Sequence, residues 1–88
     1  MNTKYDVKFT NIVKAEEGRY YYVDTSFAFD CMRLETMAFP CYDLPKPGTS
    51  LDSTVSSWSE ELCRRYDTEE EAKKGHEDIC NYLGKIVM

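Results

Sequence analysis

The sequence is poor in residues and runs on which several protein classes depend: it has one histidine, four glycines and three prolines. Its longest uninterrupted apolar run, residues 20–23, is far shorter than the roughly 18 residues that a membrane-spanning helix requires. Lys4, Asp6 and Lys8 interrupt the N-terminal region where a secretory signal would carry its apolar core. We therefore expect a cytoplasmic protein without a membrane partner.

The residues needed for common catalytic sites are also scarce. The four glycines are isolated from one another, which excludes a phosphate-binding loop, and His76 is the only histidine available to a nucleophilic cysteine. We expect His76 on the sheet-facing side of a helix, which disfavours a Cys–His enzyme. Adjacent carboxylates such as Glu60 and Glu61 are expected to be solvated, outside the apolar setting of acid–base catalysis. The sequence predicts a protein that is not an enzyme and has no cofactor.

The charge balance limits the kinds of partner. The chain has 88 residues, with 11 Lys and Arg against 16 Asp and Glu, so its formal net charge is −5. The basic residues are scattered, and no basic stripe can neutralise the phosphates of a nucleic acid. Direct nucleic-acid binding is therefore not expected. Aromatic residues make up 14% of the chain, which provides enough apolar surface for a single domain over residues 1–88.

The four cysteines allow two kinds of chemistry. Cys31, Cys41, Cys63 and Cys80 are widely spaced and follow no secretory signal, so free and mostly buried thiols are favoured over two disulfides. His76 and Cys80 are four residues apart on a predicted helix and could form a zinc site with Cys31 and Cys41. No C-x-x-C pair supports this alternative. We favour a structural His76 that is hydrogen-bonded against the sheet.

Alternating apolar and polar residues predict strands in the first half of the chain. Tyr5, Val7 and Phe9 share one face, and the alternation breaks at residues 11–13, which fits a bulge. Pro40 ends the pattern because proline cannot donate to a ladder. The predicted strands cover residues 4–14, 19–30 and 32–39.

The second half changes character. Residues 40–57 contain prolines and many Ser and Thr, and they predict a long exposed loop. Trp58, Leu62 and Tyr66 fit both a helical spacing of four and the parity of a strand. We favour a strand over residues 58–66, because a helix begins cleanly just afterwards.

The helix prediction covers residues 68–86. Thr68 and Glu71 form a capping box, and Gly75 at the edge of the apolar stripe would allow a close approach to the strands. The stripe itself recurs at helical spacing and consists of Ala72, His76, Ile79, Leu83 and Ile86. The predicted fold is α+β, with an antiparallel sheet of three to four strands and one C-terminal helix packed on one face.

The strand at residues 19–30 presents a candidate binding face. If Tyr21, Val23, Phe27 and Phe29 face the helix, the tyrosines and carboxylates between them lie on the outer face. Tyrosine supplies contact area at low entropy cost, so this face suits a protein partner unless the long loop or a second copy covers it. With the acidic clusters nearer the C-terminus, the candidate protein-binding residues are Tyr20, Tyr22, Asp24, Asp30, Glu60, Glu61, Glu69 and Glu70.

Two segments carry motifs. Residues 35–39 read ETMAF, and residues 65–76 read RYDTEEEAKKGH. They resemble the ETM-x-F strand and the RY-x-T-x-x-EA-x-x-GH helix start of a family of small uncharacterised bacteriophage and prophage proteins. The resemblance implies a small cytoplasmic protein carried by phages, without an assigned activity. Between residues 26 and 33 this chain has Phe27, Phe29 and Cys31, where such proteins often have a glycine-rich turn.

These observations predict a non-enzymatic protein-binding domain of a phage or prophage that acts on a host or phage protein in the host cytoplasm. One concrete form is an inhibitor of a host defence system such as a CRISPR nuclease, whose basic channel could receive the acidic clusters. The alternative is a self-associating structural or accessory phage protein, such as a homodimer, without a small-molecule ligand.

Overall fold

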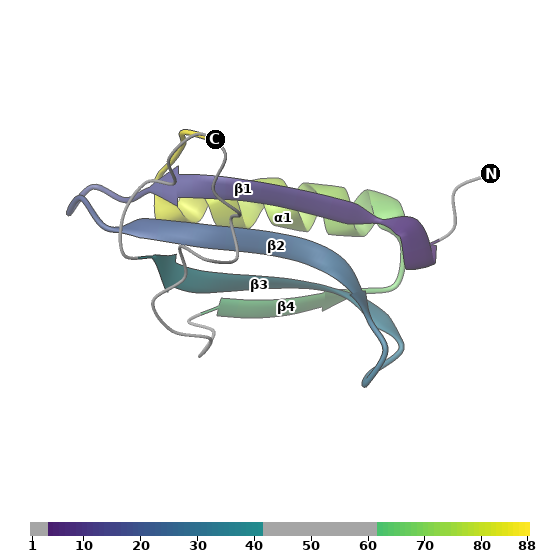
Figure 1. The fold of residues 1–88 in the computed structure, drawn as a ribbon. Helices are drawn as coiled ribbons and strands as arrows, with labels where there is room; N and C mark the ends of the chain where they lie inside the picture. The colour runs from purple at the N-terminus through teal and green to yellow at the C-terminus, as the bar shows by residue number, and fades with distance from the viewer. Residues whose placement is uncertain (1–3, 42–61) are drawn as a thin grey trace.

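A five-stranded antiparallel sheet with one helix across one face forms the part of the chain that the structure describes (Figure 1). This computed structural model describes residues 4–41 and 62–88. Its elements are a 3-10 helix η1 (Lys4–Asp6), strands β1 (Lys8–Lys14), β2 (Tyr20–Ala28), β3 (Arg33–Cys41) and β4 (Leu62–Tyr66), helix α1 (Glu69–Leu83) and strand β5 (Lys85–Ile86). The α+β class, the antiparallel sheet and the C-terminal helix are confirmed, but the sheet has five strands rather than three or four.

The strands lie in the order β4-β3-β2-β1-β5. Strands β1 and β2 pair without interruption from Lys8 opposite Ser26 to Lys14 opposite Tyr20. Strand β2 also pairs over its whole length with β3, so it forms the middle of the sheet. Because successive side chains of a strand point to opposite faces, one set of β2 residues faces α1 and the alternate set faces away from it.

The fifth strand corrects the predicted end of the helix. Helix α1 ends at Leu83, and the Gly84 N–H donates to the Cys80 carbonyl at 3.0 Å and closes the last turn. The chain then turns back along β1, where Ile86 lies opposite Val13. The prediction that the helix continues to residue 86 is therefore wrong, and Ile86 belongs to an edge strand instead of the apolar stripe.

The first strand differs from the prediction in where it begins and in the absence of a bulge. Residues 4–6 form a 3-10 turn, so β1 begins at Lys8 rather than at residue 4. The continuous pairing with β2 shows no bulge at residues 11–13. The alternation breaks because Ile12, although it faces away from α1, is fully buried in a second apolar cluster.

The third strand passes through Pro40 and ends at Cys41, two residues later than predicted. Its ladder with β4 covers Leu34 to Ala38, so the missing N–H of Pro40 interrupts none of that ladder. The strand prediction for residues 58–66 is confirmed for Leu62–Tyr66. Residues 58–61, and residues 42–57 of the predicted loop, lie outside the described residues.

Helix α1 begins as predicted. The Glu71 N–H donates to the Thr68 hydroxyl oxygen at 3.2 Å, and the Thr68 hydroxyl donates to the Glu71 carboxylate at 3.0 Å. Three glutamates in the first turn face the positive end of the helix dipole. No helix within residues 4–41 and 62–88 has the length and apolar character needed to cross a membrane.

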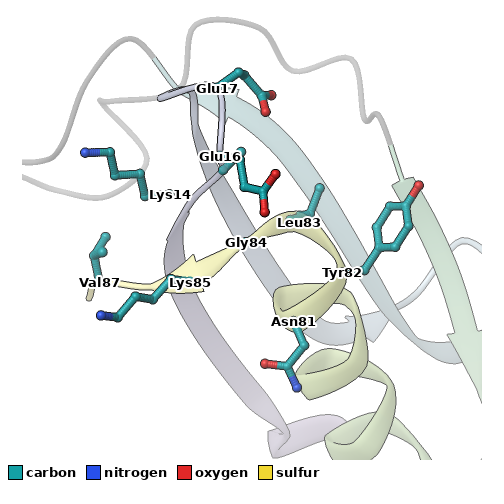
Figure 2. Close-up of a pocket in the computed structure, with 10 residues that line it drawn as sticks. Lys14, Glu16, Glu17, Asn81, Tyr82, Leu83, Gly84, Lys85 and Val87 are labelled. Carbon is teal, nitrogen blue, oxygen red and sulfur yellow. The ribbon is translucent and has the colours of Figure 1, made fainter.

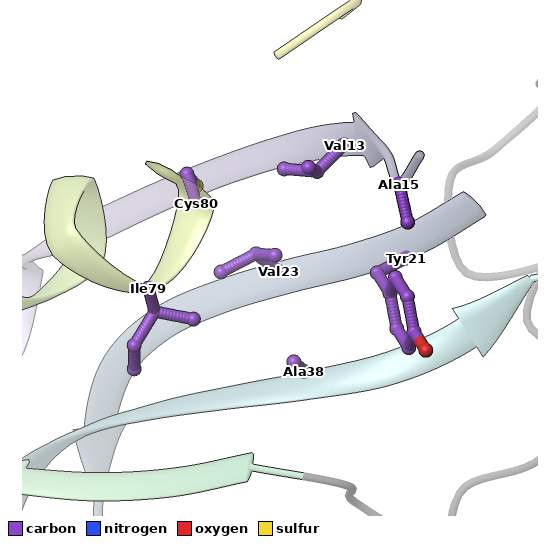
Figure 3. Packing of buried hydrophobic residues seen from close by; sticks show 7 residues of the cluster. All are labelled: Val13, Ala15, Tyr21, Val23, Ala38, Ile79 and Cys80. Atoms are coloured by element: carbon purple, nitrogen blue, oxygen red, sulfur yellow. The ribbon is translucent and has the colours of Figure 1, made fainter. Parts of the chain in front are cut away.

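The core between helix and sheet consists of two apolar clusters. Figure 3 shows Ile79 and Cys80 of α1 beside Val13 of β1 and Val23 of β2, with which they form one cluster. Toward the helix N-terminus a second group continues this layer, and its members are Val7, Phe27, Leu34, Tyr66 and Ala72. A third cluster, Ile12, Tyr22, Phe39 and Cys41, lies on the opposite face of the sheet. The sheet therefore carries buried apolar side chains on both faces.

The junction between α1 and β5 leads to a first prediction. A Cβ atom at Gly84 would lie 2.1 Å from the Lys14 carbonyl oxygen and 2.8 Å from the Ala15 Cα, both backbone atoms. Relief must come from β5, because β1 is fixed by its pairing with β2. The Ile12 N–H donates to the Met88 carbonyl at 3.0 Å, and the Val87 N–H donates to the Ile12 carbonyl at 2.9 Å. We expect Gly84→Ala to weaken both bonds and to increase hydrogen exchange of these two amides by about tenfold. Unchanged exchange at both amides would contradict this account.

Candidate functional site

The predicted tyrosine face is largely buried. Tyr22 is only 5% exposed and packs with Ile12 and Phe39, and Tyr20 is half-buried against the same cluster. The Lys14 ammonium lies 5.8 Å from the centre of the Tyr20 ring. Of the two tyrosines, only Tyr20 retains surface for a partner.

Asp24 is also occupied within the fold. Its carboxylate accepts from the Lys8 ammonium at 2.7 Å and from the Ser26 hydroxyl at 3.1 Å, and it is 8% exposed. These partners compensate for the loss of water around a buried charge. Asp24 therefore stabilises the outer face of the sheet rather than presenting a free carboxylate.

The remaining predicted site residues divide into two groups. Glu60 and Glu61 lie outside the described residues. Asp30, Glu69 and Glu70 are exposed, and they lie at the same end of the molecule, Asp30 in the β2–β3 turn and the two glutamates at the start of α1 (Figure 1). The Asp30 carboxylate accepts the Cys31 N–H at 2.9 Å, which orders the turn.

Three large apolar side chains are exposed at this end. Phe29 is 71% exposed, Met32 54% and Tyr5 52%. The Tyr5 and Phe29 rings stack with centroids 6.3 Å apart, and both contact the edge of the buried Phe27 ring, at 4.6 and 4.9 Å. We call Tyr5, Phe29 and Met32 the turn-end surface. Its rings are held in place by the core beneath them, although they face solvent.

The β2–β3 turn that carries this surface has an unusual backbone. Met32 has φ 56°, in the left-handed region that side chains other than glycine, Asn and Asp rarely adopt. Such conformations cost about 1–3 kcal/mol each and cluster at binding sites. The turn thus holds an exposed methionine in a conformation that glycine would adopt more easily.

This surface was not predicted, because the strand was extended to residue 30 and Phe29 was expected to be covered by the helix. Phe29 does lie on the same side as Phe27, with ring centroids 4.9 Å apart. It is exposed because β2 ends at Ala28 and Phe29 belongs to the turn. The turn composition, with Asp30 next to an apolar residue on either side, was the available signal.

His76 is the predicted structural histidine. It is 4% exposed under α1, its Nε2 lies 2.7 Å from the Asn11 Oδ1, and its Nδ1 lies 2.7 Å from the Thr25 hydroxyl. The Asn11 amide donates to the Met88 carbonyl at 3.0 Å, which leaves Asn11 Oδ1 as an acceptor. His76 therefore donates from Nε2, and in the neutral ring Nδ1 accepts from the Thr25 hydroxyl. Thr36 extends the chain through a hydroxyl contact with Thr25.

Burial lowers the pKa of His76, although the charges of Asp24 and Glu77 oppose the shift. The lowered pKa favours the neutral ring, whose Nδ1 can accept from the Thr25 hydroxyl. Both ring nitrogens are occupied and buried, so His76 is not placed to act on a substrate.

The four residues of the alternative zinc site do not come together in the fold. Cys41 lies in the cluster on the far side of the sheet from His76 and Cys80, and Cys31 lies in the β2–β3 turn. Burial raises the pKa of Cys80 to about 11, so its thiol stays protonated at neutral pH. Within the described ranges no three His, Cys, Asp or Glu side chains form a group that could hold a metal ion. All four cysteines are free, with Cys41 and Cys80 buried and Cys63 exposed.

The two sequence motifs meet in the fold. Glu35 of the first motif accepts from the Arg65 guanidinium of the second at 2.9 Å. The Tyr66 ring lies against Gly75, where a Cβ would approach the phenol oxygen to 2.1 Å. Burial raises the pKa of Tyr66, and the Thr36 hydroxyl beside it opposes the shift. The motif residues thus join β3, β4 and α1, which is a structural role.

A hollow of about 640 Å³ lies at the opposite end of the molecule, between the β1–β2 turn and the end of α1 (Figure 2). Lys14 and Lys85 contribute ammonium groups to its wall, and Glu16 and Glu17 contribute carboxylates. All four side chains are exposed. Catalytic sites usually hold buried titratable groups, whereas the titratable side chains that line this hollow are exposed.

The surface that combines exposure, rigid aromatic rings and local backbone strain is therefore the turn-end surface. No protein-family model, no curated protein and no solved structure matches this chain.

Proposed function

We propose that the chain is a non-enzymatic protein-binding domain that contacts its partner through the turn-end surface. The observation that carries the proposal is the stacked pair of Tyr5 and Phe29, with Phe29 71% exposed in a domain of this size. Exposed groups of large apolar side chains on small proteins mark interaction sites.

Binding to this surface should cost little side-chain entropy, because its aromatic rings are already ordered. The Phe27 ring, 7% exposed, fixes both outer rings by edge contacts, so little rotamer freedom is lost when a partner covers them. Burial of one aromatic side chain removes on the order of 150–250 Å² from water. Phe29 is therefore the residue expected to dominate the binding energy.

The narrower form of the proposal is a phage or prophage protein that inhibits a host defence system such as a CRISPR nuclease. It is supported by the resemblance of residues 35–39 and 65–76 to phage proteins. Self-association is the second candidate function. It is favoured by another apolar area at the opposite end, where Tyr82 is 79% exposed, Met88 49% and Ile86 44%.

The test compares two exposed aromatic residues at opposite ends. With the tagged protein as bait in a bacterial lysate, we expect Phe29→Ser to lower retention of the partner by about tenfold or more, because a central aromatic anchor is lost. Tyr82→Ser removes a similarly exposed ring and should leave retention unchanged. Phe29→Ser removes the ring contacts with Phe27 and Tyr5 and should lower the melting temperature by several degrees at most. Tyr82→Ser should leave it unchanged, since substitutions of exposed residues have small effects on stability.

Retention of the same proteins by the Phe29→Ser variant would overturn the proposed surface. If the wild-type protein retains only other copies of itself, and light scattering gives a dimer that Tyr82→Ser disrupts, self-association replaces protein binding as the function.

A further inference from the structure

Three exposed carboxylates lie at the same end of the molecule as the turn-end surface. Asp30 lies in the turn itself, and the exposed Glu69 and Glu70 lie in the first turn of α1 at the same end of the molecule (Figure 1). The Arg33 guanidinium binds Asp67 at 3.1 Å, which ties the start of β3 to the segment that leads into α1. The apolar side chains and the carboxylates therefore belong to one end of the fold.

Two of the positive charges near this end, Arg33 and Lys74, have acidic partners. Two more, Lys4 beside Tyr5 and Lys73 one turn beyond Glu69, are outnumbered by the carboxylates of Asp30, Glu69, Glu70 and Glu71. Arg33 is neutralised by Asp67, and the Lys74 ammonium is directed toward Asp78, 3.9 Å away in the next turn. Charges within about 10 Å of one another act together at moderate ionic strength. This end of the molecule thus has an excess of negative charge, in agreement with the net charge of −5.

This charge selects among the possible occupants. A second copy of the chain, docked by the same surface, would bring two acidic ends together, and like charges in an interface are costly. A neutral apolar partner would gain nothing from the carboxylates. A protein surface with an apolar patch flanked by lysine or arginine fits both the rings and the charges.

We propose that the partner of the turn-end surface is a protein with a basic, apolar contact patch, such as a protein surface shaped to bind polyanions. This inference rests on the proposed protein-binding function and adds the chemical class of the partner. The carboxylates speed and orient the encounter, and Tyr5, Phe29 and Met32 supply the contact that slows dissociation.

The test uses two double variants that remove the same charge. Glu69→Gln with Glu70→Gln, and Glu16→Gln with Glu17→Gln, each change the net charge from −5 to −3, but the second pair lies in the β1–β2 turn at the opposite end. The probe is an amphipathic helical peptide of leucine and lysine, with a leucine–glutamate peptide of the same pattern as its counterpart. Binding is followed by NMR at the Met32 methyl group and the Phe29 amide.

We expect the lysine peptide, and not the glutamate peptide, to shift the signals of Met32 and Phe29. The Glu69/Glu70 variant should weaken this binding about five- to tenfold at low salt, and the difference should disappear near 0.5 M salt. The Glu16/Glu17 variant should bind within about twofold of the wild-type protein, since its lost charges lie beyond the screening distance.

Equal weakening by the two double variants, or equal binding of the glutamate peptide, would overturn the inference. The same holds if the lysine peptide shifts Tyr82 as strongly as Phe29. A lysate partner that is lost with Phe29→Ser but retained fully by the Glu69/Glu70 variant would refute the basic partner and leave the protein-binding function standing. If no lysate protein depends on Phe29, the proposed function itself fails.

Discussion

Replacement of Gly75 by alanine is expected to destabilise the fold, although alanine is the better helix former. The new Cβ would lie 2.1–2.3 Å from the hydroxyl oxygen and two ring carbons of Tyr66, which is 5% exposed and cannot swing away. Overpacking of this kind costs about 1–3 kcal/mol beyond the gain of about 1 kcal/mol in helix propensity. Chemical denaturation at pH 7.5 measures the difference.

The control measures the change in stability caused by Gly75→Ala in a protein that already carries Tyr66→Leu. Tyr66→Leu removes the clashing atoms while an apolar side chain stays in the core. In that background Gly75→Ala should be neutral or stabilising, because only the propensity gain remains. A Gly75→Ala cost that is the same in both backgrounds would show that the contact with Tyr66 does not limit how closely α1 approaches the sheet.

The second large effect is expected at His76. His76→Leu leaves the Asn11 Oδ1 and the Thr25 hydroxyl without their imidazole partner beneath α1, and an unpaired buried polar group costs about 1–3 kcal/mol. We expect a loss of about 2–4 kcal/mol in the free energy of unfolding. The double variant His76→Leu with Thr25→Val should lose less than the sum of the two single changes, since it removes both partners of one hydrogen bond.

The same histidine should make stability depend on pH. Because burial lowers the pKa of His76 in the folded state, the unfolded chain takes up a proton first, near pH 6.5. This stabilising contribution is complete above that value and is lost as the pH falls toward the folded pKa, by up to about 1.4 kcal/mol per pH unit. His76→Gln should remove this part of the slope between pH 7.5 and pH 5. An unchanged slope would contradict a neutral His76 in the folded state.

The sequence predicted the helix–sheet contact better than the outer surface. The capping residues Thr68 and Glu71, the close approach at Gly75 and the buried His76 all follow from helical spacing, which depends on neighbours in the chain. The short β5 could not be predicted, because a two-residue strand has no period and Ile86 continued the apolar stripe in phase.

The burial of Tyr22 had a signal that the strand parity obscured. Tyr22 lies opposite Ile12 on β1 and opposite Phe39 on β3, and Cys41 points to the same face as Phe39. The register of the sheet thus brings four apolar side chains together on the outer face. The break of the alternation at Ile12 indicated this second layer. Register between strands is a long-range property, and a single sequence without pairing information does not fix it.

The meeting of the two motifs separates the architecture of the protein from its contact residues. Glu35 with Arg65, and Tyr66 with Gly75, join β3, β4 and α1 without using any residue of the turn between Ala28 and Arg33. The sequence of the turn can thus change without loss of the contacts that join β3, β4 and α1. Libraries that randomise residues 29–32 can therefore be displayed on this domain to select new binding specificities, while the helix and strands remain constant.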